Sequence, residues 1–317
     1  MRAFLPLLLL FAGCSGGELI DEAPAAEAIP HTYLTSEAVT STRLKGTLVE
    51  PMVARTDTLA VIIPGSGPTD RNGNGPMFSS DAYRMLAEAL ADDGVPSLRI
   101  DKRGMFGSSE AGDPNAVTLD SYRGDMAAWL TAMDRDCVVL VGHSEGGLIA
   151  LQPVDLPGVC GVVLLATPGR KLGDVLREQL RANPLNRPIL DEAESAITAL
   201  ERGERVDTAG MNPALASLFR EDVQGFLMGL LAFDPAEAAR SVDVPLMVVG
   251  GGKDAQVTRE DFDALASADD LSVWFDGMSH TLKGVNALTA ARSYQDPEMP
   301  LEVGLVTSIV PFILSVD

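Results

Sequence analysis

The chain has 317 residues, of which 46% are hydrophobic, so it has enough apolar material for one large α/β domain with an insertion or for two small domains. A formal net charge of −21 at pH 7 repels phosphate backbones and argues against nucleic-acid binding, and it disfavours docking of basic patches on anionic lipid. The three cysteines and three histidines form no zinc-type cluster, so the sequence predicts no metal site.

The N-terminus has the pattern of a targeting segment. Arg2 is followed by an almost unbroken apolar run over residues 3–12, which is too short to span a bilayer but suits the core of a signal peptide. The run ends at Phe11-Ala12-Gly13-Cys14-Ser15. This ending resembles a bacterial lipoprotein signal, in which small residues precede a cysteine that is lipidated and becomes the new N-terminus.

Two processing routes fit this segment. Phe11 departs from the aliphatic residue usual three positions before a lipidated cysteine, and the alternative is ordinary secretion with cleavage near Gly13. We predict a signal segment at residues 1–14, with Cys14 as the lipidated residue and as the protein's only attachment to a membrane. Residues 15–40, which begin with a stretch rich in Gly, Ala, Glu and Pro, are predicted to be a tether. We therefore expect an exported protein, either a membrane-anchored lipoprotein or a periplasmic or secreted protein.

Strands and helices are predicted to alternate over the next part of the chain. Short apolar runs bounded by Gly and Pro indicate strands at 44–53, 58–63, 95–100, 137–141 and 159–165. The spacing of apolar residues indicates helices at 80–93 and 119–133, and a further helix after Ser144. Alternation of this kind implies an α/β fold, with a mostly parallel central sheet covered by helices on both faces.

The alternation stops after Pro168. The next segments are all predicted to be helical, with no strand between them: 172–182, 189–204 and 214–233. Two strands and a closing helix follow, at 245–249, 271–275 and about 301–314. We therefore predict an α/β core formed by residues 41–170 and 241–317, interrupted by a helical cap at 171–240.

The segment Gly142-His143-Ser144-Glu145-Gly146-Gly147 predicts the nucleophile of a hydrolase. It follows the strand 137–141 directly, so Ser144 would lie on a sharp strand-to-helix turn that lifts its hydroxyl clear of the backbone. The flanking glycines are needed because a Cβ would clash in such a turn. The G-x-S-x-G pattern alone is weak, and a glycine-rich turn without chemistry is the alternative. The strand before it and the helix after it favour a catalytic serine.

A serine hydroxyl needs a positioned base, and the chain has three histidines. His31 lies in the predicted tether. His143 is adjacent to Ser144 and should point away from it, because neighbouring residues near a strand end face opposite sides. His280, just after the predicted strand 271–275, remains as the candidate base.

The orienting acid should lie between the serine and the histidine, on a loop after a strand. Asp254 follows the glycine-rich strand end Gly250-Gly251-Gly252 and would hold the imidazole tautomer and stabilise the imidazolium. Asp276 is the rival because it lies closer in sequence to His280. We prefer Asp254, and a solvated loop carboxylate is the alternative for either residue.

An oxyanion needs two backbone N–H donors. Glu145, directly after the nucleophile, should supply one of them. Ser66, in the loop Gly65-Ser66-Gly67 after the first core strand, should supply the other, because glycines let the backbone approach a bound carbonyl. A plain turn is the alternative for this loop.

Five motifs together resemble the ordered motifs of bacterial α/β-hydrolase esterases. They lie at 63–74, 101–104, 142–147, 252–257 and 277–280, and the likeness runs from about Leu44 to the C-terminus. The resemblance implies the α/β-hydrolase fold and a Ser-Asp-His carboxylesterase that uses no cofactor and takes a small-molecule ester as substrate.

Pro64 and Arg103, both within these motifs, bear on the geometry of the predicted site. Many members of the wider superfamily have His-Gly in the oxyanion loop, whereas Pro64 precedes Gly65 in this chain. In such enzymes the residue at Arg103 helps to organise the strand end beside the active site, and a structural salt bridge is the interpretation that we favour for it.

The predicted cap would lie over the nucleophile and set the size and polarity of the acyl pocket. Most of its large apolar residues are expected to form the core of the cap rather than to contact substrate, namely Met211, Leu218, Phe219, Phe226, Leu227, Met228 and Leu231. Cys137 and Cys160 begin two neighbouring strands, where a disulfide is permitted in an exported protein but buried free thiols are more common.

Three functions remain open from the sequence. The first is hydrolysis of carboxylic esters of small to medium acyl chains through an acyl-enzyme. The second is a thioesterase or peptidase of the same fold, which shares the acyl-enzyme chemistry. The third is a surface binding module that kept the fold and lost activity, and the complete set of Ser, His and Asp argues against it.

Overall fold

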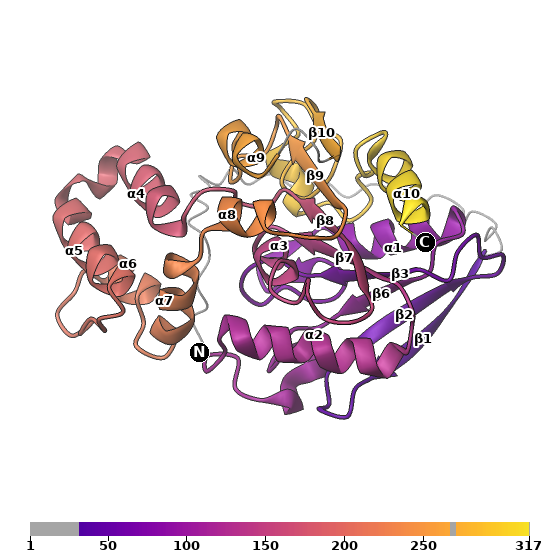
Figure 1. The fold of residues 1–317 in the computed structure, drawn as a ribbon. Coiled ribbons are helices and arrows are strands. Elements are labelled where there is room, and N and C mark those ends of the chain that lie inside the picture. Colours follow the sequence, from indigo (N-terminus) through magenta and orange to yellow (C-terminus); the bar gives the residue numbers. More distant parts are fainter. Residues whose placement is uncertain (1–31, 267–270, 317) are drawn as a thin grey trace, which may run out of the picture.

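The computed structural model describes residues 32–266 and 271–316 (Figure 1). The predicted signal segment with Cys14, the first part of the predicted tether, and His31 lie outside the described residues. Within the described part of the chain, no helix is both long and apolar enough to cross a membrane.

The described residues form an eight-stranded sheet that confirms the predicted fold class. Its strands have the order β1-β2-β6-β3-β7-β8-β9-β10, and the pairs from β6 to β10 are parallel, whereas β1 and β2 pair antiparallel. The bounds are β1 (Tyr33–Val39), β2 (Lys45–Pro51), β3 (Leu59–Ile63), β6 (Ser97–Ile100), β7 (Val138–His143), β8 (Val159–Leu165), β9 (Leu246–Gly251) and β10 (Leu271–Phe275). A short antiparallel hairpin lies outside this sheet and consists of two strands of two residues each, β4 (Asn74–Gly75) and β5 (Phe78–Ser79).

The central strands are apolar on both faces because helices cover both. All residues of β3 and β7 are buried, which is why these strands appear in the sequence as continuous apolar runs. One face packs against α1 (Ala82–Asp92) and α10 (Leu305–Ser315). The other packs against α2 (Leu119–Met133), α3 (Glu145–Ala150) and α9 (Arg259–Leu265). Figure 1 shows these helices on the two sides of the sheet.

The first strand lies where the sequence predicted a tether. Residues 33–39 form β1 and pair with β2 from Tyr33↔Pro51 to Val39↔Lys45, so the tether prediction over residues 15–40 is wrong at its C-terminal end. Five residues of this edge strand, 34–37 and Val39, are exposed. A strand with so little buried surface has no apolar pattern that sequence analysis can detect.

The helical segment between β8 and β9 has a core of its own. It consists of α4 (Leu172–Ala182), a 3-10 turn (Pro184–Ile189), α5 (Leu190–Glu201), α6 (Pro213–Leu218), α7 (Gln224–Ala232) and α8 (Pro235–Arg240). Six of the seven apolar residues proposed from the sequence pack in this core, as expected. The seventh, Phe226, packs instead against the sheet cluster, with its ring centroid 5.7 Å from that of Tyr122 on α2.

The single helix predicted over 214–233 is broken into α6 and α7. The break follows Phe219, and the Gln224 side-chain amide donates to the Phe219 carbonyl and to the Val206 carbonyl, both at 2.8 Å. The Gln224 amide therefore satisfies a carbonyl that a continuous helix would have bonded through its backbone.

Polar contacts also join the helical segment to the sheet domain, in addition to the packing of Phe226 and of α8. Figure 1 shows α4 to α7 at one side of the sheet, with α7 nearest to α2. Arg220 donates to the side-chain oxygen of Asn115 at 3.1 Å, and Arg170 bridges Glu178 on α4 at 2.5 Å and Asp261 on α9 at 3.1 Å.

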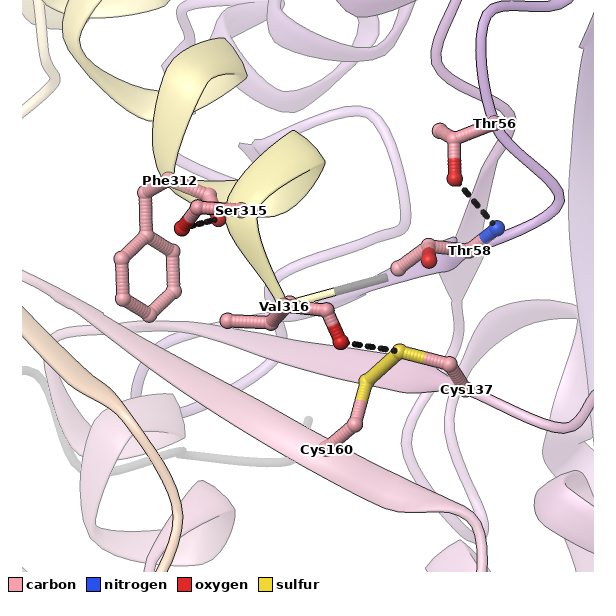
Figure 2. Close-up of a disulfide and its surroundings, with 7 residues drawn as sticks. All are labelled: Thr56, Thr58, Cys137, Cys160, Phe312, Ser315 and Val316. Carbon is pink, nitrogen blue, oxygen red and sulfur yellow. Dashed lines mark hydrogen bonds between the residues drawn. A yellow bond between two sulfur atoms is a disulfide. The ribbon is translucent and has the colours of Figure 1, made fainter.

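A disulfide joins the starts of the two neighbouring strands β7 and β8 (Figure 2). Cys137 and Cys160 have Cα atoms 5.3 Å apart, which is within the usual range for a bridged pair. The sequence left the pairing of these cysteines open, with free thiols the more common state at such positions, and the structure shows a disulfide. The parallel pairing of β7 and β8 brings the cysteines together: Val138 lies opposite Val159 and Val139 opposite Gly161, and the register shift between these two pairs leaves Cys160 unpaired in the ladder, free to bridge to Cys137.

Candidate active site

Ser144 occupies the turn between β7 and α3. Its backbone has φ 54° and ψ −125°, a conformation that is strained for a residue other than glycine. The turn is held because the Ser144 N–H donates to the Leu165 carbonyl of β8 at 2.9 Å, and the Gly147 N–H donates to the Ser144 carbonyl at 2.9 Å. A strained serine between a buried strand and a helix is the geometry of a nucleophile elbow.

Two glycines beside this serine are required by close backbone packing. A Cβ on Gly142 would lie 2.4 Å from the Gly146 carbonyl oxygen, and a Cβ on Gly146 would lie 2.3 Å from the Ile63 carbonyl oxygen. Gly146 thus packs tightly against the backbone at the end of β3. The loop that follows β3 therefore passes directly beside Ser144, and a Cβ on Gly65 would be 3.2 Å from the Ser144 Cβ.

Asp254 and His280 are brought together by the parallel pair β9 and β10. Because Gly251 pairs with Phe275, the loops that leave these two strands start side by side. His280 Nδ1 lies 2.8 Å from Asp254 Oδ2, and both side chains are buried. The other carboxylate oxygen of Asp254 accepts the backbone N–H groups of Gln256 at 2.7 Å and Val257 at 2.9 Å. These bonds aim one oxygen of Asp254 at His280.

Asp276, the rival acid, contacts a different residue. Its carboxylate accepts the indole N–H of Trp274 at 3.1 Å. The geometry therefore favours Asp254 over Asp276 as the partner of His280.

Both ring nitrogens of His143 contact residues other than Ser144. Its Nδ1 lies 2.7 Å from the Tyr83 hydroxyl, and its Nε2 lies 2.7 Å from the carbonyl oxygen of His280. Burial, together with the nearby His280, lowers the pKa of His143 to about 3. His143 is therefore neutral at ordinary pH.

No hydrogen bond joins Ser144 to His280 among the described residues, although both lie next to His143. The rings of His143 and His280 have centroids 4.8 Å apart. Hydrogen bonds between nucleophile and base are often long without substrate and shorten only in the complex.

The loop with Gly65 and Ser66 is fixed by bonds to its carbonyl oxygens. Lys102, a buried lysine, donates to the Gly65 carbonyl at 2.6 Å, and Thr69 donates to the Ser66 carbonyl at 2.9 Å. The N–H groups of Ser66 and Glu145 have no protein acceptor among the residues that the structure describes. Two unpaired backbone donors on either side of a serine suit the stabilisation of an oxyanion.

Three ion pairs support the end of β6 beside this loop. Lys102 contacts Glu145 at 3.0 Å, and Arg71 contacts Asp101 at 2.5 Å. Arg103 pairs with the buried Asp125 and also donates to the Ala111 carbonyl at 2.8 Å, which confirms the structural salt bridge. Burial raises the pKa of Asp125, and the Arg103 guanidinium opposes that rise.

Sequence reasoning missed two residues that contact this site. Tyr83 lies in the helix predicted at 80–93 and Lys102 in the motif at 101–104, but neither residue was assigned to the site from the sequence. The motif at 101–104 could have indicated that Lys102 lies at the site. No pattern in the sequence indicates the contact between Tyr83 and His143. In the described chain, no group of three or more His, Cys, Asp or Glu side chains is placed to hold a metal ion.

The chain is similar in sequence to known hydrolases. A model of the alpha/beta hydrolase family matches residues 60–287. The chain is also similar to Esterase EstD of Thermotoga maritima, with 25% identity over 229 residues, which cover 70% of this chain and 53% of EstD. The chain thus spans about half the length of that relative.

Two solved structures show the same fold. A proline iminopeptidase of Mycobacterium smegmatis has a TM-score of 0.53 and 18% identity, with 89% of this chain and 98% of that chain covered. The esterase domain of a Rhodothermus marinus protein has a TM-score of 0.52 and 19% identity, with 90% of this chain and 99% of that chain covered. At these identities the likeness extends to the fold alone.

Proposed function

The chain belongs to the alpha/beta hydrolase family, and from that premise we propose that it is a serine esterase. Ser144 is the nucleophile, His280 the general base and Asp254 the acid that orients His280. The substrates are carboxylic esters of small to medium acyl chains. The observation that carries the proposal is the buried contact of 2.8 Å between His280 and Asp254, which lies beside the strained turn at Ser144.

The geometry supports a two-step acyl transfer. Asp254 accepts the Nδ1–H of His280, so Nε2 is left free to take the hydroxyl proton of Ser144 as Oγ bonds to the ester carbonyl carbon. The N–H groups of Ser66 and Glu145 stabilise the oxyanion. Collapse of this intermediate breaks the bond to the alcohol, which leaves with the proton from His280. Water then attacks the acyl-enzyme by the same route and regenerates Ser144.

The other functions that the sequence left open receive less support. A thioesterase or peptidase would use the same residues, and the structural likeness to an iminopeptidase extends to the fold alone. A binding module without activity has no need to keep Ser144 strained or His280 paired to a buried carboxylate.

Pre-steady-state kinetics test the proposal. Mixing the protein with nitrophenyl esters of increasing acyl length should release a burst of nitrophenol equal to the concentration of active sites, followed by slower steady turnover. The matching thioesters and amides, measured in parallel, are expected to be hydrolysed more slowly than the best ester. Absence of ester hydrolysis at every acyl length would reject the proposal.

We also propose export with lipid attached at Cys14. The apolar run ending in Gly13-Cys14 motivates this, and the Cys137–Cys160 disulfide supports an oxidising compartment. Bacteria fed radiolabelled palmitate should label the wild type but not Cys14→Ser. Equal labelling of both proteins, or of neither, would contradict lipidation and leave ordinary secretion.

A further inference from the structure

A chain of buried hydrogen bonds connects three parts of the proposed active site. The backbone N–H of Gly65 donates to the Tyr83 hydroxyl at 3.1 Å, and this hydroxyl lies 2.7 Å from His143 Nδ1. His143 Nε2 lies 2.7 Å from the carbonyl oxygen of His280. Tyr83, His143 and His280 are all buried. These hydrogen bonds therefore lead from the oxyanion loop at Gly65, through His143 beside Ser144, to the loop that carries His280.

The acceptors in this series of hydrogen bonds determine where the protons of His143 and the Tyr83 hydroxyl lie. The His280 carbonyl can only accept, so His143 must carry its proton on Nε2 and donate it there. Its Nδ1 is then an acceptor and receives the single proton of the Tyr83 hydroxyl. The hydroxyl oxygen in turn accepts from Gly65. The arrangement needs a neutral imidazole at position 143, and the low pKa of His143, about 3, keeps it neutral.

We propose that Tyr83 and His143 are positioning residues that hold the oxyanion loop and His280 in register with Ser144. This inference rests on the proposed esterase function. Gly65 precedes the oxyanion donor Ser66, His143 precedes the nucleophile Ser144, and His280 is the base. The hydrogen bonds through Tyr83 and His143 therefore link the oxyanion loop, the nucleophile turn and the base, and neither residue contacts the reacting atoms. Register of this kind matters because a misplacement of about 1 Å can cost about a hundredfold in rate.

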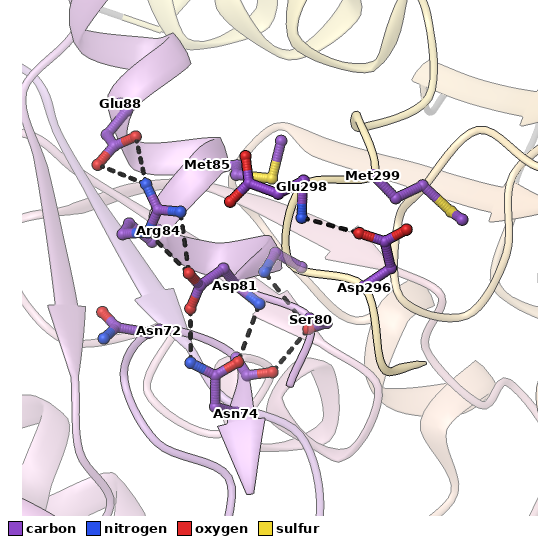
Figure 3. A network of polar contacts seen from close by, with 12 residues as sticks. Asn72, Asn74, Ser80, Asp81, Arg84, Met85, Glu88, Asp296, Glu298 and Met299 are labelled. Carbon is purple, nitrogen blue, oxygen red and sulfur yellow. Dashed lines mark hydrogen bonds and ion pairs between the residues drawn. The ribbon is translucent and has the colours of Figure 1, made fainter. Parts of the chain in front are cut away.

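Tyr83 is suited to this role because a network of polar side-chain contacts holds the start of α1 (Figure 3). The Asn74 and Asp81 side chains bond each other, and the Asn74 side chain also accepts the Asp81 N–H at 2.9 Å. Arg84 bridges Asp81 at 2.9 Å and Glu88 at 3.0 Å. The Tyr83 N–H itself donates to the Asn72 carbonyl at 3.1 Å. The helix turn that carries the hydroxyl is therefore anchored independently of His143.

The two loops at the ends of this series of hydrogen bonds, the oxyanion loop and the loop of His280, are each held by a second contact. Lys102 holds the Gly65 carbonyl at 2.6 Å. The loop of His280 is closed by the Ser279 N–H, which donates to the Lys283 carbonyl at 3.0 Å, and Lys283 Nζ donates to the Met299 carbonyl at 2.5 Å. Removing the Tyr83 hydroxyl should therefore shift these loops slightly rather than unfold them.

The first test compares two buried tyrosines that lose the same atom. Tyr83→Phe should lower the burst rate constant and kcat on a nitrophenyl ester on the order of tenfold or more, with KM nearly unchanged. Tyr122→Phe, on α2 and outside the chain of bonds, should retain wild-type kinetics. Circular dichroism and melting temperature accompany each variant, because a merely structural role would lower the melting temperature and leave kcat of the folded enzyme intact.

The second test varies His143. His143→Gln keeps an N–H that can reach the His280 carbonyl, so it should retain more activity than His143→Leu, which keeps none. The double variant Tyr83→Phe/His143→Leu should lose less activity than the product of the two single losses, because without His143 the hydroxyl can still accept from Gly65 but has no route to His280. If Tyr83→Phe fails to fold, this His143 series decides the matter by the same kinetic comparison.

The outcomes separate this inference from the proposed function. Wild-type kcat in Tyr83→Phe, equal activity of the two His143 variants, or multiplicative losses in the double variant would each overturn the positioning role. Such results leave the esterase proposal intact if Ser144→Ala is inactive. Activity that persists in Ser144→Ala would instead reject the serine mechanism and this inference with it.

Discussion

Ser144→Ala is expected to abolish esterase turnover and leave the fold intact. Loss of the nucleophile from a complete triad removes on the order of a millionfold in kcat. The fold should persist because the Ser144 hydroxyl bonds no other group among residues 32–266 and 271–316, while the bond of its N–H to the Leu165 carbonyl is kept by alanine. The measurement is kcat and burst amplitude on one nitrophenyl ester, and the burst should vanish completely.

Ser195→Ala provides the matched control. Ser195 is exposed on α5, where its hydroxyl donates to the Asp191 carbonyl at 2.8 Å, so its removal should leave kcat at the wild-type value. Far-ultraviolet dichroism of both variants should match that of the wild type. Turnover by Ser144→Ala close to the wild-type value would reject Ser144 as the nucleophile.

Asp254→Asn is expected to cost several orders of magnitude in kcat, for a reason that the structure makes specific. Oδ1 of Asp254 accepts the N–H groups of Gln256 and Val257, so the oxygen of an asparagine would take that position. The amide NH₂ would then face His280 Nδ1 and force it to be an acceptor. The proton of His280 would lie on Nε2, where it blocks transfer from Ser144. The comparable change in a serine protease costs about ten-thousandfold.

Asp276→Asn is the matched comparison. Asp276 accepts from Trp274 at 3.1 Å, a bond that the asparagine oxygen can keep, so kcat should change little. Both variants should retain their far-ultraviolet dichroism, since lost activity must not arise from unfolding. If Asp276→Asn proves far more damaging than Asp254→Asn, the loop after Phe275 supplies both acid and base and the assignment of Asp254 is wrong.

The sequence by itself determined those features that depend on short-range patterns. Continuous apolar runs predicted the buried strands of the sheet, because strands covered on both faces have no polar side. The elbow at Ser144 was readable because a tight strand-to-helix turn demands glycines at fixed positions around it. With three histidines in the chain, elimination was enough to nominate His280.

Features that expose most of their side chains left no such pattern. β1 was assigned to the tether because five of its seven residues face solvent, and its pairing with β2 is a matter of backbone hydrogen bonds. The break between α6 and α7 depends on the Gln224 side chain, which bonds carbonyls of Phe219 and Val206. Helical spacing alone could not show that bond.

Contacts between distant residues were decided only by the tertiary structure. The choice between Asp254 and Asp276 depended on the register of β9 and β10, and the pairing of Cys137 with Cys160 depended on that of β7 and β8. The bonds from Tyr83 to His143 and from His143 to His280 span 60 and 137 residues of sequence. A hydrogen bond requires atoms to meet within about 3 Å, and no local pattern in a sequence specifies which distant atoms the packing of a sheet and its helices will bring that close.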